Sequence, residues 1–210
     1  MSDVLSSTRS QILDAAEGLF ARKGYDATTI KEIGRASGVN PALLYYYFAG
    51  KEDLYKAVLQ RLFDTILSQG GAVLDGSVPP AEAIRRLLAL QAEWLLARPN
   101  SYRLLVREMV DHDARHAQEV MLQMAAGPFQ LLCRVIEQGQ QSGSFRTDLE
   151  PRFAALSTIA QVVYFFIFRP AVGIFFGQGP AGVADQTARD FARHAGEFAL
   201  SALSPTGKTA

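Results

Sequence analysis

Two histidines stand four residues apart, at His112 and His116, and one face of a helix can hold a metal ion with this spacing. Asp113 and Glu119 lie close by and could add carboxylate ligands. The surrounding run, DHDARHAQE, is rich in charge and free of proline, which is typical of a solvated helix end. We therefore predict no metal site and no cofactor, with metal binding by the two histidines left as an open alternative.

Nucleophilic and redox chemistry have little support. The one cysteine, Cys133, lies in an apolar run, which favours an inert core thiol over a redox sensor. A single cysteine cannot form an intramolecular disulfide, as expected in a reducing cytoplasm. The sequence contains no HExxH, CxxC or GxSxG motif and no glycine-rich phosphate loop. We predict that the protein is not an enzyme.

A cluster of polar, apolar and aromatic side chains is suited to contact with DNA. Asn40 can pair with an adenine edge, and Ala42 and Leu43 can contact a thymine methyl group. Tyr45 and Tyr46 can bond phosphates through their hydroxyls. The alternative is that the aromatic run is simply core. At helical spacing these rings cannot all point inward, so the two tyrosines are expected to face outward.

Two short helices and a tight turn must position this cluster. Thr29 and Glu32 match a capping box at the start of the first helix, and Asn40 with Pro41 matches the start of the second. The turn contains Gly38, as helix-turn-helix turns often do. The inner packing is expected from Ile33, Val39, Leu44 and Tyr47. The outer face is then free to enter a major groove.

Phosphate contacts are expected where helices begin, because free N–H groups and the helix dipole attract anions there. Thr28 and Lys51 hold such positions, and Lys51 adds a full charge. The predicted DNA-binding residues are Thr28, Thr29, Asn40, Pro41, Ala42, Leu43, Tyr45, Tyr46 and Lys51.

Composition and charge narrow the class of protein. The 210 residues are 49% hydrophobic and 20% charged, enough to bury a core, and the formal net charge is zero. This balance argues against a strongly basic, non-specific nucleic-acid binder. The apolar run at 153–168 is short for a membrane span and favours a core helix. The polar N-terminus lacks the design of a signal peptide, so we expect a cytoplasmic protein without membrane association.

The periodicity of apolar residues predicts an all-α chain of about nine helices. A three-helix helix-turn-helix domain is expected at 1–50, a helical ligand-binding and dimerisation domain at 51–203, and a flexible tail at 204–210. The longer helices are placed near 51–72, 79–97, 100–112, 115–142, 150–176 and 183–203. Pro128 and Pro170 fall inside two of them and are expected to kink them.

Residues 8–60 resemble the N-terminal domain of the TetR family of repressors. The resemblance is carried by Ile12 to Ala16, Leu19-Phe20, Lys23-Gly24-Tyr25, Thr28-Thr29, Ile33, Ala36 to Val39, Leu44 to Phe48 and Lys51 to Leu54. It implies a dimer that binds a palindromic operator, represses transcription and is released by a ligand. By position, Thr28, Tyr46 and Lys51 match the family's phosphate contacts, whereas Asn40, Ala42 and Tyr45 fall where the family reads bases.

This chain departs from the family pattern at two places on the predicted DNA-reading face. Asn40-Pro41 stands where the family often has serine and another small or polar residue. Leu43 is apolar on a face that is often polar. These departures leave the operator sequence open.

The later helices are expected to hold a small apolar or aromatic effector. The runs at 103–111 and 161–166 resemble the CecR-type C-terminal domain, which implies a regulator linked to multidrug or stress responses. Each apolar side chain taken alone is more often core than pocket, and for Arg107 an ion pair with a carboxylate inside the fold is favoured over ligand contact. The candidate pocket residues are Trp94, Tyr102, Arg107, Met109, Met124, Phe129, Gln161, Tyr164, Phe165 and Phe168.

The helices near 150–176 and 183–203 are the candidates for homodimerisation, since the family pairs its last two helices as a four-helix bundle. Small residues that would allow close approach are Ala154, Ala155, Ala192, Ala195, Gly196 and Ala199, with Phe191, Phe198 and Leu200 supplying buried area. Two rivals remain: a DNA-binding adaptor without a ligand, and a helical hydrolase or carrier without DNA binding. The helix-turn-helix argues against the second rival.

Overall fold

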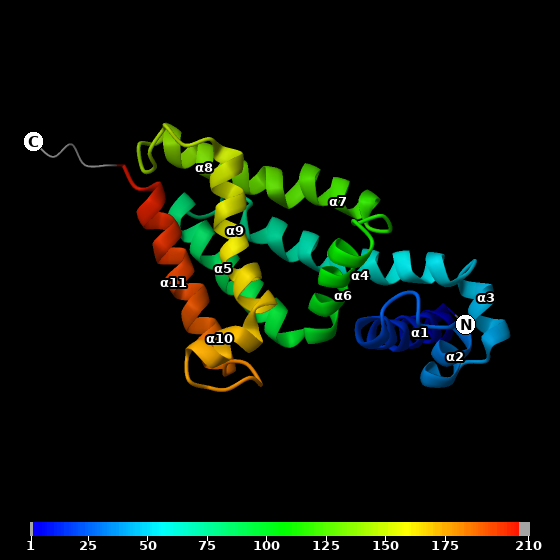
Figure 1. Ribbon diagram of the computed structural model, residues 1–210. Coiled ribbons are helices and arrows are strands. Elements are labelled where there is room, and N and C mark those ends of the chain that lie inside the picture. The colour runs from blue at the N-terminus through cyan, green and yellow to red at the C-terminus, as the bar shows by residue number, and fades with distance from the viewer. Residues whose placement is uncertain (1, 206–210) are drawn as a thin grey trace, which may run out of the picture. The chain divides into compact units, whose positions relative to one another are not determined.

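The computed structural model describes residues 2–205, with side chains from residue 7 onward, and over this range the chain is helical with no strand (Figure 1). The predicted all-α class is therefore confirmed. The elements are α1 (Ser2–Lys23), α2 (Ile30–Ser37), α3 (Pro41–Tyr47), α4 (Lys51–Val73), α5 (Pro80–Ala97), α6 (Pro99–Asp111), α7 (Gln118–Met124), the π-helical turn η1 (Ala125–Phe129), α8 (Gln130–Gln141), α9 (Pro151–Ile167), α10 (Arg169–Phe175) and α11 (Asp185–Leu203).

The chain forms two compact units. Unit 1 comprises Met1–Ile66 and Arg98–Gln123, and unit 2 comprises Leu67–Ala97 and Met124–Ala210. Helices α4 and α7 each begin in unit 1 and end in unit 2. The division into domains at residue 50 stays a prediction, and most of the predicted tail at 204–210 lies outside the described residues.

The core of unit 1 is built on the apolar face of α1. Ile12, Ala16 and Phe20 are fully buried there, at the spacing of successive helical turns. Tyr55 of α4 is buried against them, and its ring meets the edge of the Phe20 ring with 4.8 Å between centroids. The buried faces of α2 and α3 pack onto the same cluster. The helices that would meet DNA are thereby fixed to α1 and α4.

Two helices predicted as continuous are broken, each next to a proline. The predicted helix at 115–142 is wrong: it divides into α7, η1 and α8, and Gly127 has non-helical dihedral angles of φ −103° and ψ −107°. Pro128 follows directly; proline has no N–H to donate, and its ring collides with the carbonyl group of the preceding turn. The π-helical turn absorbs this defect. The kink expected at this proline is confirmed.

The predicted helix at 150–176 is likewise wrong as one element. Helix α9 ends at Ile167, and α10, which begins at Arg169, is bent from it by 79°, so the kink expected at Pro170 is confirmed. Pro170 lies in the first turn of α10, where a missing N–H costs nothing. Among the described residues, only this bent pair is long and apolar enough for a membrane crossing, and no single helix is.

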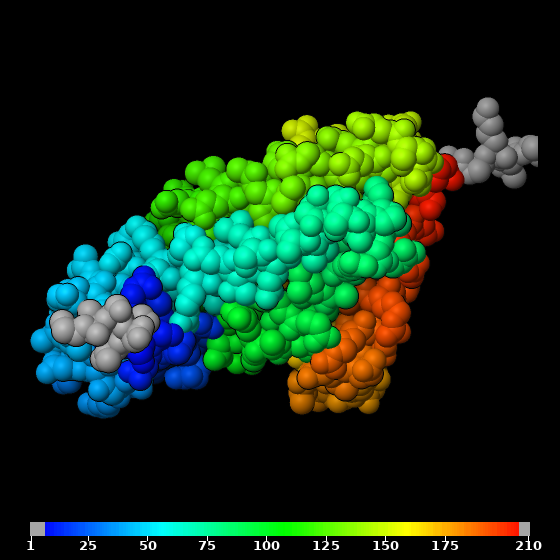
Figure 2. Space-filling view, turned by 180° about the vertical axis from the view of Figure 1, so that it is seen from behind, coloured from blue at the N-terminus to red at the C-terminus, as the bar shows by residue number. Residues whose placement is uncertain are grey.

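In unit 2, α11 lies along an outer edge and packs on α5 and α9 (Figures 1 and 2). Its small residues Ala192, Ala195 and Gly196 are buried. The Cα of Arg85 and a methyl of Leu88, both on α5, lie about 4 Å from where a side chain on Gly196 would begin. Small residues thus let α5 and α11 approach closely.

Candidate nucleic-acid interface

The first helix of the predicted helix-turn-helix is capped at both ends as expected. The Thr29 hydroxyl accepts a hydrogen bond from the Glu32 amide at 3.2 Å, and the Glu32 carboxylate accepts one from the Thr29 amide at 3.0 Å. Helix α2 ends at Gly38, whose φ of 71° lies in the left-handed region that suits glycine. The predicted capping box is confirmed.

A salt bridge ties the beginning of α2 to the end of α1. Lys23 donates to the Glu32 carboxylate, which already serves the cap. This bond to Lys23, followed by the hydrogen bonds with Thr29, lowers the pKa of Glu32 to about 2. The carboxylate therefore stays charged across the physiological range of pH.

Helix α3 crosses α2 at a glycine. A Cβ atom on Gly34 would lie 3.0 Å from the Val39 carbonyl oxygen and 3.2 Å from both Leu44 Cδ1 and Pro41 Cγ. Such distances leave no room for a larger residue unless the turn moves. Ile33 and Leu44 are fully buried at this crossing, as predicted, while Val39 and Tyr47 are partly buried against the same core.

The outer face of α3 is exposed and has no basic residue. Tyr45 and Tyr46 have exposed fractions of 61% and 72%, high values for large aromatic side chains. The predicted contact residues on the exposed surface are Thr29, Asn40, Pro41, Ala42, Leu43, Tyr45 and Tyr46. The structure therefore brings these seven together along the N-termini of α2 and α3 and the outer side of α3.

The side-chain oxygen of Asn40 already caps α3. Its Oδ1 atom accepts a hydrogen bond from the Ala42 amide at 2.9 Å, which caps α3. Bidentate pairing with adenine uses both the oxygen and the nitrogen of an asparagine amide. Such pairing would compete with the cap, whereas a single hydrogen bond donated by Nδ2 would not.

Two predicted phosphate contacts, Thr28 and Lys51, use their side chains to bond backbone carbonyl groups of the protein. Thr28 is fully buried, and its hydroxyl donates to the Gly24 carbonyl oxygen at 2.8 Å, so its side chain is not on the exposed surface. Lys51 donates to the carbonyl oxygens of Tyr25 and Asp26 at 3.0 and 3.3 Å, and its ammonium lies 4.3 Å from the centre of the Tyr25 ring. Thr28 thus stabilises the loop before α2, and Lys51 fastens α4 to that loop.

The expectation that the histidine-rich run is solvated is wrong for His116, which is buried. Its amide donates to Glu108 Oε1 at 2.7 Å, and its Nδ1 atom lies 3.1 Å from Glu108 Oε2. Glu108 is itself fully buried on α6, and its carboxylate also bonds the Tyr55 hydroxyl. Among the described residues, no cluster of three metal-ligating side chains occurs.

The sequence predicts only part of this buried polar cluster of Glu108, His116 and Tyr55. Glu108 interrupts an apolar run, which indicates a need for a partner, but Arg107 was the expected ion-pairing residue. Arg107 does face a carboxylate, at 3.7 Å from Asp111, with both side chains more than 40% exposed. The buried carboxyl group instead meets His116 across the tight turn that follows α6.

The predicted effector residues do not gather in one unit. Tyr102, Arg107 and Met109 lie on α6 in unit 1, and the other seven lie in unit 2. Within unit 2, Trp94 and Phe165 are buried. Met124, Phe129 and Gln161 are half-buried, and Tyr164 and Phe168 are exposed and pack on each other with 4.4 Å between ring centroids.

Two buried polar atoms on α5 have no hydrogen-bond partner among the described residues. They are Oε1 of Gln91 and Nε1 of Trp94, one acceptor and one donor three residues apart. The Gln91 amide nitrogen does donate, to the Ile159 carbonyl oxygen at 3.3 Å. Leaving such atoms unpaired is costly, so each calls for an explanation.

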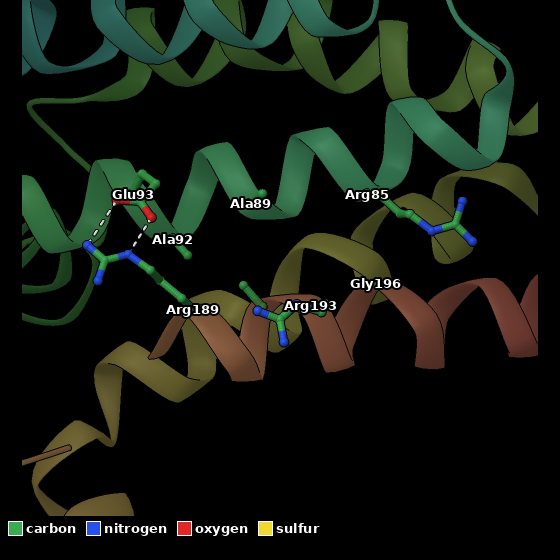
Figure 3. Close-up of a pocket in the computed structure, with 8 residues that line it drawn as sticks. Arg85, Ala89, Ala92, Glu93, Arg189, Arg193 and Gly196 are labelled. Carbon is green, nitrogen blue, oxygen red and sulfur yellow. Dashed lines mark hydrogen bonds and ion pairs between the residues drawn. The ribbon is translucent and has the colours of Figure 1, made fainter. Parts of the chain in front are cut away.

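Most of the small and apolar residues expected to form a dimer interface are used within the chain. In Figure 3, Ala89 and Ala92 of α5 and Gly196 of α11 lie where the two helices run side by side, and Arg189 pairs with Glu93 across them. Phe191 stacks on Phe165 with 4.3 Å between ring centroids. The residues of the expected interface that are buried inside one chain are Ala155, Ala192, Ala195, Gly196, Ala199 and Leu200.

A different face of the same helices is exposed and apolar. Phe153, Leu156, Tyr164 and Ile167 recur along α9 at intervals that keep them on one side of the helix, and all are exposed. Phe198 on α11 is exposed as well. Exposed apolar patches of this kind mark interaction surfaces.

Sequence models of known families match both halves of the chain. Residues 12–58 match the model described as bacterial regulatory proteins, tetR family. Residues 80–195 match the model described as tetracyclin repressor-like, C-terminal domain. The second match alone spans more than half of the chain.

Similar proteins agree with these matches. The repressor NicS of Pseudomonas putida is 29% identical over 161 residues, or 76% of this chain and 75% of that protein. The repressor KstR2 of Rhodococcus jostii is 25% identical over 149 residues, or 71% and 73%. A TetR family regulator from Marinobacter aquaeolei has a similar structure, with a TM-score of 0.75 and 24% identity over 97% and 99% of the two chains.

Proposed function

Because the chain belongs to the TetR family, whose members are transcriptional regulators and not enzymes, we propose that it is a homodimeric repressor that binds a palindromic operator and is released by a small apolar or aromatic effector. One observation carries the DNA-binding part of this proposal. Tyr45 and Tyr46 project into solvent from a helix that is capped, crossed at a glycine and fixed to the core. A fold gains nothing from exposing two adjacent aromatic rings, whereas a DNA-reading face does.

We assign roles to the exposed residues according to what each can still offer. Leu43 and Ala42 supply apolar contact for thymine methyl groups, and Tyr45 falls beside them for base or sugar contact. Tyr46 bonds phosphate through its hydroxyl, whereas the Thr29 hydroxyl already donates to the Glu32 carboxylate at 3.0 Å and supports the cap. Lys51 retains one ammonium N–H and contributes its charge, while the buried Thr28 supports the loop instead of touching DNA.

DNA footprinting tests this assignment. The region upstream of the gene is the first target, with genome-wide selection of bound fragments as the second. Tyr46→Ala should weaken operator binding by about tenfold, the worth of one good contact. Phe175→Ala removes an exposed aromatic ring at the end of α10, outside both α3 and the exposed face of α9, and should leave binding unchanged. Equal affinity of the Tyr46 variant and the wild type would exclude α3 as the reading element.

The effector part of the proposal rests on α5. Gln91 Oε1 and Trp94 Nε1 offer an acceptor and a donor in the apolar interior of unit 2, as a site for an apolar molecule with a few polar groups requires. One structural neighbour is described as a ketosteroid regulator, KstR2 of Mycobacterium tuberculosis. Another, FadR of Bacillus subtilis, was solved in complex with stearoyl-CoA. Both descriptions favour an apolar effector for this chain.

Calorimetry with androstenedione and with stearoyl-CoA tests the effector site. Gln91→Leu removes the side-chain amide and nearly keeps the size of the side chain, and Trp94→Phe removes the indole N–H and keeps an aromatic ring. Either variant should weaken binding of an effector that uses the site by about tenfold. An effector that binds both operator-bound and free protein equally would change nothing, so the operator affinity must be measured with and without it. A protein that binds neither probe and keeps its operator would fit the ligand-free adaptor.

The dimer is proposed to form through the exposed apolar face of α9 together with Phe198 of α11. A two-fold axis there would relate two copies of α3, which matches the two-fold symmetry of a palindrome. Light scattering during size-exclusion chromatography measures the state directly. Phe198→Asp should convert a dimer into a monomer, whereas Phe176→Asp changes an equally exposed phenylalanine that lies outside α9 and α11 and should not.

A further inference from the structure

A groove of about 550 Å³ lies between α1 and α6, entirely within unit 1. It is separate from the exposed face of α3 and from the unpaired polar atoms of α5. We propose that this groove binds a small molecule that carries an oxyanion, a carboxylate or a phosphate, on an apolar body. The proposal goes beyond the repressor function, and its test uses the protein without DNA.

The charge of the groove is the first argument. Three arginines line it, Arg22, Arg103 and Arg107, against one carboxylate, that of Asp111. Arg22 and Arg103 form no ion pair with any side chain that the structure describes, and Arg107 reaches Asp111 only at 3.7 Å. The lining of the groove therefore carries three positive charges against one negative charge, in a chain whose formal net charge is zero.

A second groove in the molecule provides the contrast. It lies between α5 and α11 in unit 2 and is also lined by arginines (Figure 3). There Arg85 pairs with Glu197 and Arg189 pairs with Glu93, each at 2.7 Å. Those arginines have their counter-ions within the fold, so arginine content alone does not make an anion site. In the groove of unit 1, Arg22 and Arg103 have no such partner among the described side chains, and only Arg107 has one, Asp111.

The apolar lining is the second argument. Arg103, Val106, Arg107 and Val110 recur at intervals of three and four residues, so one face of α6 alternates guanidinium and isopropyl groups. Val110 has an exposed fraction of 74%, which places an apolar surface beside the charges. Tyr102 adds an aromatic ring, and burial raises the pKa of its hydroxyl to about 12, so the phenol stays neutral.

The chemistry of guanidinium defines the ligand class. Its planar fork binds the paired oxygens of a carboxylate or phosphate through two parallel hydrogen bonds, which an ammonium cannot do. The neighbouring valines and the tyrosine ring then favour a hydrocarbon or aromatic body over a bare ion. Inorganic phosphate should accordingly bind far more weakly than an amphipathic anion.

Isothermal titration with three eight-carbon probes tests the site on the full chain. Octanoate, octyl phosphate and octanol each have eight carbons in an unbranched chain and carry different head groups. We expect the anions to bind at least about tenfold more tightly than octanol, because the head group contributes a charge-assisted bidentate bond. Preference for octanoate or for octyl phosphate identifies the natural head group, and either preference supports the site.

Variants locate the binding. Arg103→Ala should weaken the anions by about tenfold or more and leave octanol unchanged, and Arg103→Lys should restore only part of the loss. Arg134→Ala removes an exposed arginine of α8 in unit 2 and serves as the matched control. Equal binding of all three probes would overturn the proposal, as would anion binding that survives Arg103→Ala and Arg22→Ala. A loss of operator affinity in these variants without any probe would assign the arginines to DNA phosphates instead.

Discussion

Removing the buried carboxyl group of Glu108 should be the most damaging single change in unit 1. The side chain is fully buried and serves three donors: the His116 amide, the His116 ring and the Tyr55 hydroxyl. Glu108→Ala leaves all three without an acceptor. Breaking a buried pair of this kind costs about 3–5 kcal/mol, whereas a typical domain is stable by only about 5–15 kcal/mol.

Glu108→Gln separates the loss of all hydrogen-bond acceptors at this position from the loss of the negative charge. A glutamine keeps one carbonyl oxygen for the His116 amide and nearly the same volume, but its NH2 group faces the remaining donors. We expect it to cost about 1–3 kcal/mol, the price of one unsatisfied buried group. The alanine variant should therefore be clearly less stable than the glutamine variant.

The loss of stability in the Glu108 variants is best measured by a method that reports on unit 1. The one tryptophan, Trp94, is in unit 2, so its fluorescence does not report directly on the environment of Glu108. Native-state hydrogen exchange of α1 and the first half of α4 reports directly on the core of unit 1, which contains Glu108. A loss of about 3 kcal/mol should speed exchange of the most protected amides there by roughly a hundredfold. Exchange unchanged in Glu108→Ala, or equally fast in both variants, would refute the assignment of the carboxyl group as the shared acceptor.

Two further outcomes follow from the helix-turn-helix. Glu32→Gln keeps the capping box but removes the charge that pairs with Lys23. Because the pKa of Glu32 in the folded protein, about 2, lies below the usual value, the wild type should lose stability as the pH falls from about 4.3 toward 2. In a series of thermal melts over this pH range, the variant should lose less stability than the wild type. Gly34→Ala should gain up to about 1 kcal/mol from helix propensity. It also forces a Cβ atom to 3.0 Å from the Val39 carbonyl oxygen, which costs about 1–3 kcal/mol of strain. Urea denaturation should therefore show a net loss in the free energy of unfolding. A more stable Gly34→Ala protein would mean that the turn yields easily.

The sequence predicts the DNA-reading half well because its determinants are local. A capping box, an asparagine before a proline and a left-handed glycine act within a few residues, and each is found where expected. The apolar spacing of α1 likewise identifies a buried face. Short-range rules of this kind need no knowledge of the rest of the fold.

The errors arise where distant partners decide the outcome. His116 lies in a run that is polar in sequence, yet the turn after α6 folds it back onto Glu108 and beneath Tyr55. Thr28 stands at a helix start, yet it bonds backward to the Gly24 carbonyl oxygen. The small residues of α11 match close packing with either α5 or a second chain, and only the three-dimensional arrangement shows that α5 takes them.

The absence of lysine and arginine from α3 has a consequence for how the protein searches the genome. Loose, sequence-independent residence on DNA is driven by release of counterions from phosphates, and it grows with the number of cations at the contact. A reading helix that offers tyrosine, leucine and alanine contributes little to that residence. The salt dependence of binding should therefore come from basic residues outside α3, such as Lys31 and Arg35 of α2, and the contacts made by α3 itself should vary little with salt.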